Sequence, residues 1–161
     1  MIRVNVEVNT KFWYKKIKNP NKYFSEKLRK ISKIIPHIKG KNIIFTILLT
    51  NSLNMKKLNK KFRNRNKSTD VLSFPYFSSN NIKLSYKKSI YIGDIATCYE
   101  IINIRSKKNN FQLEFDKAWV HGFLHLFGYD HSSELEAEEM ENLERKICVN
   151  LGFTDPYTPI N

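Results

Sequence analysis

The sequence has 161 residues, of which 41 % are hydrophobic and 13 % aromatic; these proportions exclude a disordered chain and fit a single domain over residues 1–161. Its 28 Lys and Arg against 15 Asp and Glu give a net charge of +13, which favours a polyanionic partner such as nucleic acid, although compositional bias from an AT-rich genome would also enrich lysine. With two distant cysteines, no signal-peptide core at its start and no apolar run long enough to cross a membrane, the chain is predicted to be cytoplasmic.

The first predicted elements are a strand, a helix and a second strand. Residues 2–8 alternate apolar and polar side chains, which is typical of a half-buried strand. Apolar residues at helical spacing then predict a helix over residues 20–35, stopped by Pro36. Residues 42–50 form a continuous run rich in Ile and Leu, which indicates a central strand.

A second amphipathic helix follows, capped by Asn51 or Ser52, and its spacing predicts a buried stripe of Met55, Leu58 and Phe62. Residues 63–69 are polar and basic and are predicted to form a loop. Residues 70–75 read as a strand, and their proline suits an edge position because it cannot donate to a neighbouring strand.

The remaining residues predict one more strand and three more helices. Residues 78–88 are loop-like, and residues 89–96 form the strand. Capping-box spacing at residues 97–100 predicts a short helix to about Lys107. A longer helix covers residues 111–127, and the last begins at a second capping box, Ser133 to Glu136, and ends near Gly152. This order predicts an α+β fold in which a mixed four-stranded sheet packs against about five helices.

Three of the four histidines fall close together, at His121, His125 and His131. The first two are four residues apart, so they lie on one side of a helix and can bind the same ion. Gly128 can take a left-handed conformation, end the helix and return the third histidine to that ion. Three neutral imidazoles leave the fourth position of a zinc ion open, which is the pattern of a catalytic site. The fourth histidine, His37, follows a helix-stopping proline and is predicted to be structural or exposed.

The histidine spacing matches the zinc-protease pattern H-E-x-x-H-x-x-G-x-x-H, so the active-site helix is expected to be metzincin-like. Gly122 stands where those proteases have the glutamate that acts as general base. Because general-base catalysis contributes roughly 10²–10⁴-fold, its loss argues against a peptidase.

Three segments resemble the YbeY family of single-strand-specific, metal-dependent endoribonucleases. The stretch from His121 to His131 fits the family motif H-G-x-L-H-L-x-G-Y-D-H at every fixed position. Upstream, Leu58-Asn59 with Phe62-Arg63, and the run from Thr69 to Pro75, resemble the family's L-N-x-x-Y/F-R and T-D-V-L-S-F-P segments; Gly93-Asp94-Ile95 resembles its L-G-D-I element. The likeness spans about residues 40–145.

The resemblance implies one Zn²⁺ or similar ion on the three histidines and a role in ribosomal RNA maturation, at the 3′ end of the small-subunit RNA, and in ribosome quality control. Its implied partners are single-stranded RNA and the small ribosomal subunit. The resemblance also points to Arg63 as a catalytic or phosphate-binding residue. Asp130 is predicted to orient a ligand histidine or, alternatively, to serve as a base. The native metal and the attacking nucleophile, metal-activated water or the RNA 2′-OH, stay open.

Two other functions compete with the nuclease: a ribosome assembly factor that binds RNA and holds a structural zinc, and the disfavoured metallopeptidase. Phe74 and Tyr76 are either core and rim residues or could stack on unpaired bases, although only alternate residues of a strand can face a groove. The basic run at residues 56–61 is either a solvated face or an RNA contact. The acidic residues of 134–144 are predicted to form a solvated face, Cys98 to lie in the core, and Asp70 to brace the loop.

Overall fold

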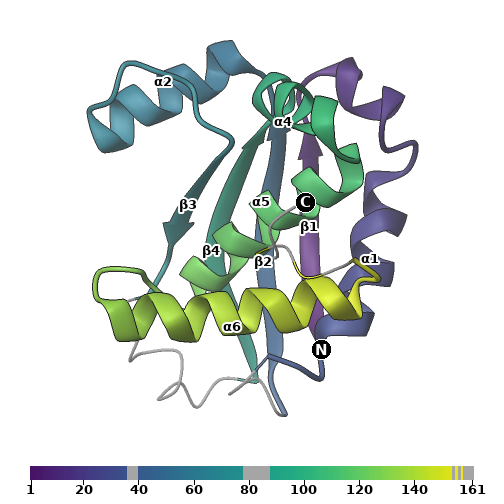
Figure 1. Cartoon of the computed structure of the whole chain (residues 1–161), viewed down its shortest axis with the longest axis vertical. Helices are drawn as coiled ribbons and strands as arrows, with labels where there is room; N and C mark the ends of the chain where they lie inside the picture. The colour runs from purple at the N-terminus through teal and green to yellow at the C-terminus, as the bar shows by residue number, and fades with distance from the viewer. Residues whose placement is uncertain (36–39, 78–87, 154, 156, 158–161) are drawn as a thin grey trace.

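A mixed sheet of four strands forms the centre of the fold (Figure 1) in the computed structural model, which describes residues 1–35, 40–77, 88–153, 155 and 157. The strand order is β1-β2-β4-β3; the first three strands are parallel, and β3 pairs antiparallel with β4 at an edge. Their bounds are β1 (Ile2–Val8), β2 (Asn42–Thr50), β3 (Val71–Pro75) and β4 (Ser89–Cys98). The predicted α+β class, mixed sheet and edge position of the proline strand are confirmed.

Five α-helices in the described residues pack with this sheet, in agreement with the sequence: α1 (Pro20–Ile31), α2 (Ser52–Arg63), α4 (Tyr99–Arg105), α5 (Phe111–Leu126) and α6 (Glu134–Asn150). Two 3₁₀ helices, η1 (Lys11–Lys15) and η2 (Ser106–Lys108), were not predicted. Helix α5 packs against β3 and β4, and α6 packs on α5 and crosses in front of the sheet in Figure 1. This arrangement holds α5 between the sheet and α6.

The main core lies between α5 and the sheet. Phe115, Trp119 and Phe123 lie on one side of α5 and are fully buried. Phe123 packs against Phe45 of β2 with ring centroids 4.9 Å apart. Burial of each such side chain contributes on the order of 1.5–3 kcal/mol. The rings therefore fix α5 firmly against the sheet.

Helix α2 differs from its predicted pattern in one position. Asn51 is the cap, since its side chain accepts a hydrogen bond from the backbone N–H of Asn54 at 3.0 Å. Met55 is fully buried as expected, but Phe62 is 54 % exposed, so the predicted stripe is wrong there. Asn59 is buried instead, and its amide donates to the carbonyl of Lys67 at 2.7 Å. The helix thus uses a polar contact to hold the following loop, which hydrophobic periodicity does not predict.

The predicted capping box at residues 97–100 is wrong, because β4 continues through Thr97 to Cys98 and α4 starts at Tyr99. Backbone pairing with β2 and β3 extends to these residues and overrides the local signal. The carboxylate of Glu100 accepts from the backbone N–H of Ser52, at the start of α2, at 2.9 Å. Glu100 therefore joins two helices and does not cap its own.

The other element boundaries lie within two residues of those predicted, except the end of α1. Helix α1 ends at Ile31, earlier than predicted, and Ile35 remains buried beyond it. Cys98 is buried as expected. His37 and most of the expected loop at 78–88 lie outside the described residues. Among the described helices, none has both the length and the apolar character needed to cross a lipid bilayer.

Candidate metal centre and its cleft

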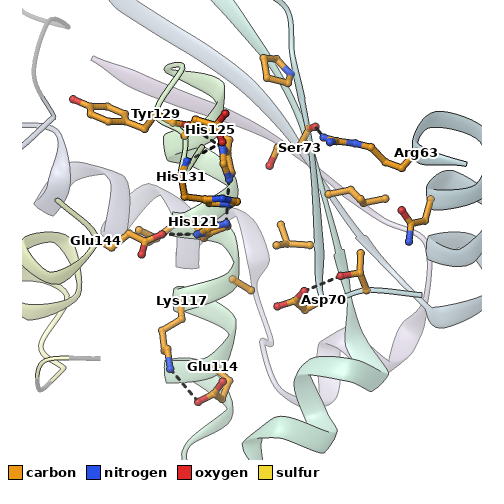
Figure 2. A pocket seen from close by; sticks show the side chains of 18 of the residues that line it. Arg63, Asp70, Ser73, Glu114, Lys117, His121, His125, Tyr129, His131 and Glu144 are labelled. Atoms are coloured by element: carbon orange, nitrogen blue, oxygen red, sulfur yellow. Dashed lines mark hydrogen bonds and ion pairs between the residues drawn. The ribbon is translucent and has the colours of Figure 1, made fainter. Parts of the chain in front are cut away.

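A cleft of about 1030 Å³ lies between β3, the loop that follows α2, and α5 with the turn after it. Its lining includes all five residues that the sequence predicted for the site: Arg63, His121, His125, Asp130 and His131. Figure 2 shows the three histidines together, with Arg63 on the other side of Ser73 in this view. The structure therefore brings together residues that are up to 68 positions apart in the sequence (131 − 63).

The turn after α5 places the third histidine. Gly128 has φ of 85°, in the left-handed region that favours glycine, as predicted. Its backbone N–H donates to the carbonyl of His125 at 2.9 Å, and that of Tyr129 donates to the carbonyl of Leu124 at 3.2 Å. These two bonds form a Schellman motif, which ends the helix and reverses the chain. As a result His131 returns to the two histidines of the helix.

The three imidazoles converge on a common point. The Nε2 atoms of His121 and His125 are 3.1 Å apart, and one ring nitrogen from each of the three histidines lies within 4.8 Å of the others. Two nitrogen ligands of a tetrahedral zinc, each roughly 2.0–2.1 Å from the metal, lie about 3.3 Å apart. The separation of the first pair is thus close to that of two ligands of a single ion.

In His121 and His125, the hydrogen bond at Nδ1 defines which ring nitrogen carries the proton. His125 donates from Nδ1 to the carbonyl of Tyr129 at 2.8 Å, and a carbonyl oxygen can only accept. His121 pairs through Nδ1 with the carboxylate of Glu144 at 2.7 Å. In their neutral forms, both rings therefore present Nε2 lone pairs to each other. Burial, and secondly the neighbouring His121, lower the pKa of His125, which favours this neutral form. Two facing lone pairs repel unless a cation lies between them, so this donor set fits a metal ion.

Glu144 is a site residue that the sequence reading missed. The acidic residues of α6 up to Glu141 are exposed, as predicted for a solvated face, but Glu144 is only 6 % exposed and points at His121. The helical period of α6 could have indicated that Glu144 is buried. It lies one residue after Leu143 and three before Ile147, both buried residues of this helix. A carboxylate beside the apolar stripe of a helix requires a partner, and here the partner is a candidate metal ligand.

Arg63 and the histidine helix are connected through one residue of the edge strand. The Arg63 guanidinium donates to the carbonyl of Ser73 at 3.1 Å. The Ser73 hydroxyl donates in turn to the carbonyl of Gly122 at 3.0 Å. Arg63 is the last residue of α2, and the left-handed Asn64 directly after it ends that helix. These contacts hold the guanidinium in the same cleft as the histidines.

Asp130 contacts the loop that carries His131. Its carboxylate accepts from the backbone N–H of His131 at 2.8 Å and from the hydroxyl of Ser132. These bonds, chiefly that from Ser132, lower the pKa of Asp130. The ring partners of the other two histidines are Glu144 and the Tyr129 carbonyl. Asp130 thus fixes the backbone of the ligand loop.

Gly122 stands where the zinc proteases have their glutamate, and side chains of β3 occupy the space beside it. A Cβ atom there would lie 2.9 Å from the Ser73 hydroxyl and 2.9 Å from a methyl group of Val71. Helix α5 therefore lies against β3 at a distance that only glycine allows. The side chain of a general base has no room at this position.

One of the three aromatic residues in and directly after β3 lines the cleft. From this part of the chain the lining includes Asp70, Val71, Leu72, Ser73, Pro75 and Phe77. Phe74 instead packs on Phe62 with ring centroids 5.1 Å apart, and Tyr76 is 69 % exposed outside the cleft lining. Phe74 and Tyr76, for which base stacking was one possibility, therefore do not line this cleft, whereas Phe77, two residues after the end of β3, does.

The fold and site define an α+β protein with three clustered histidines that could hold a metal ion. The family model described as Endoribonuclease YbeY matches residues 7–152, and the chain belongs to this family. A relative named Endoribonuclease YbeY from Pelagibacter ubique is 47 % identical over 135 residues, which cover 81 % of this chain and 84 % of the relative. A second relative named Endoribonuclease YbeY, from Buchnera aphidicola, is 40 % identical, and the match covers 95 % of this chain and 96 % of the relative. The solution structure of TM1509 from Thermotoga maritima is similar in fold, with a TM-score of 0.58, 24 % identity, and coverage of 99 % of this chain and 100 % of that one.

Proposed function

We propose that this protein is a metal-dependent endoribonuclease that cleaves single-stranded RNA and acts in ribosomal RNA maturation, at the 3′ end of the small-subunit RNA, and in ribosome quality control. Its relatives are named endoribonucleases, so the chain is assigned to the hydrolases that cut RNA. The proposal places one Zn²⁺ on each chain and all of the machinery in one domain over residues 1–161. Two buried free cysteines favour a reducing compartment, the cytoplasm.

The observation that carries the proposal is the pair of Nε2 atoms 3.1 Å apart, in the same cleft as an arginine. His121, His125 and His131 would hold the metal, which supplies a Lewis acid able to polarise a phosphate oxygen or to activate water. The hydrogen bonds at Nδ1 of His121 and His125 keep their Nε2 lone pairs directed at this point.

Arg63 is the residue best placed to hold the scissile phosphate. Cleavage of a phosphodiester develops negative charge on its non-bridging oxygens, and a guanidinium can bind two of them at once. Arg65 and Lys67 line the same cleft and extend the positive surface along the loop. Among the described residues that line the cleft, the cations Arg105 and Lys117 are paired with Asp70 and Glu114. Asp70 therefore braces this side of the cleft, as the sequence suggested.

A preference for single strands follows from the cleft's aromatic residues. Phe77 and Tyr129 line it and are partly buried. Unpaired bases can stack on such rings at about 1–3 kcal/mol per base, whereas the bases of a duplex are already stacked inside it. The small ribosomal subunit, whose RNA has single-stranded ends, is the proposed partner.

The test pairs zinc analysis with RNA cleavage for the wild type and a His125→Ala variant, on matched single-stranded and duplex RNA. We expect one zinc per wild-type chain and cleavage of the single strand, with both lost in the variant. Wild-type protein that holds zinc but cuts neither RNA, even with small subunits present, would favour an assembly factor with a structural metal. Product ends distinguish the nucleophile: 2′,3′-cyclic phosphates indicate attack by the RNA 2′-OH.

A further inference from the structure

The buried carboxylate of Glu144 lies between the metal centre and the C-terminal segment. One of its oxygens, Oε1, accepts from Nδ1 of His121 at 2.7 Å, as drawn in Figure 2. The other, Oε2, accepts from the hydroxyl of Tyr157. Both carboxylate oxygens therefore have a donor, and the two donors come from different parts of the chain.

Tyr157 is held in place by the residue next to Glu144. Arg145 forms an ion pair through Nε with Asp155 at 2.7 Å, and its guanidinium lies over the Tyr157 ring, 5.6 Å from the centroid. Burial, followed by the adjacent Glu144, raises the pKa of Tyr157, so its hydroxyl stays protonated and continues to donate. Residues 155 and 157 are thus fixed on α6 beside the cleft, which both Tyr157 and Glu144 line.

We propose that Glu144 is a positioning residue for the metal ligand His121 and that Tyr157 holds the Glu144 carboxylate in the orientation this requires. The inference rests on the proposed metal centre. By accepting from Nδ1, the carboxylate fixes the tautomer that leaves the Nε2 lone pair free for the metal. It also sets the rotation of the ring and increases the electron density available at Nε2.

The acidic residues of α6 differ in burial and in hydrogen-bond partners. Glu138 is exposed on the same helix, whereas Glu144 is buried and has two specific partners. An ionised carboxylate is costly to bury unless it is paired and hydrogen-bonded, so Glu144 needs both contacts. His125 has a backbone carbonyl in the corresponding role, so of these two ring contacts only that of His121 can be removed by a side-chain substitution.

The experiment measures the zinc dissociation constant of metal-free protein by competition with a chelating dye. Loss of such an outer carboxylate typically lowers metal affinity 10–100-fold, and we expect this for Glu144→Ala. Glu144→Gln keeps an acceptor oxygen but no charge and should fall between Glu144→Ala and the wild type. Tyr157→Phe should weaken binding a few-fold, and the matched control Glu138→Ala should not change it. Thermal unfolding of each metal-free variant shows whether the fold is intact.

The possible results separate the positioning role of Glu144 from the existence of the metal centre. A zinc affinity for Glu144→Ala within about twofold of the wild type would remove the positioning role while leaving the metal centre in place. If Glu144→Ala does not fold, Glu144→Gln and Tyr157→Phe decide the question: wild-type affinity in both would overturn the proposal. Wild-type protein that binds no zinc would refute the metal centre and the positioning role together.

Discussion

In their neutral forms, His121 and His125 direct the lone pairs of their Nε2 atoms at each other. Each ring uses its Nδ1 for an oxygen partner, Glu144 for the first and the Tyr129 carbonyl for the second, and the two Nε2 atoms are left 3.1 Å apart. Without a cation between them these lone pairs repel, and His121 and His125 would be the residues that hold a metal ion at this point. Metal binding should therefore stabilise the folded protein.

Zinc is expected to raise the melting temperature. At a free concentration 100 times the dissociation constant, a ligand specific for the folded state adds about 2.7 kcal/mol. For a domain of this size that corresponds to about 5–10 °C. Thermal unfolding with chelator and with added zinc measures the shift. His125→Ala should show no shift and Glu138→Ala the full one; an equal shift in His125→Ala would place the metal elsewhere.

Arg63→Ala should reduce turnover of single-stranded RNA about 10²–10³-fold, the usual effect of removing one donor to a developing anionic charge. Zinc content should not change, because Arg63 contacts Ser73 and none of the histidines. Arg63→Lys should recover only part of the rate, since an ammonium cannot bind two oxygens side by side.

The control for Arg63 is Lys30→Ala, which removes an exposed cation of α1 that is absent from the cleft lining. Single-turnover rates and metal analysis on all three variants make the test. Wild-type turnover in Arg63→Ala would exclude the guanidinium from the reaction.

Gly122→Ala should destabilise the fold. Its Cβ would lie 2.9 Å from both the Ser73 hydroxyl and a Val71 methyl group. Overpacking of this kind costs about 1–3 kcal/mol, against which the better helix propensity of alanine returns about 1 kcal/mol. The net loss should appear in urea unfolding, whereas Gln112→Ala, at an exposed position of α5, should cost little. A Gly122→Ala protein as stable as the wild type would show that α5 can move away from β3.

Phe77→Ala should weaken binding of single-stranded RNA, by about 1–3 kcal/mol if one base stacks on the ring. The control is Tyr14→Ala, which removes an exposed aromatic ring outside the cleft lining. Fluorescence anisotropy with a labelled oligonucleotide measures both. Equal affinities for the two variants would assign Phe77 to packing alone.

The cysteine thiols should react slowly while the protein is folded. Burial raises the pKa of Cys148 to about 12, and burial also raises that of Cys98. The thiolate is the reactive form, so at pH 8 only about one Cys148 thiol in 10⁴ is ionised. Alkylation by iodoacetamide, followed by mass spectrometry, should be slow at pH 8 and should accelerate as the pH rises or when urea unfolds the chain. Fast labelling of the folded protein would contradict this assignment.

The parts of the fold that follow from local pattern were predictable. The helical period of α5, the glycine at position 128 and the cap at Ser133 each act within a few residues, and the structure bears them out. The alternation of β3 also follows from local geometry. Phe77, which follows the strand and lines the cleft, could be assigned to it only once the structure was known.

Contacts between distant residues could not be predicted in the same way. Thr97 has the sequence of a helix cap but pairs within the sheet, because β2 and β3 supply partners for the strand up to that point. Glu144 looks like one more exposed acid unless the depth of α6 in the fold is known, since His121 is 23 residues before it. Both differences have the same physical origin, tertiary contacts that outweigh a local preference.

The edge position of β3 has a consequence for aggregation. In its antiparallel pairing with β4, the backbone groups of Asp70 and Tyr76 bond to β4, so those of the odd-numbered residues between them point outward. An outward row of this kind can recruit a strand from another molecule. Here Arg63 donates a hydrogen bond to the carbonyl of Ser73, and Pro75 has no backbone N–H to donate. Arg63, whose side chain is proposed to hold RNA, and Pro75 thus also hinder the addition of a strand from a second copy of the chain.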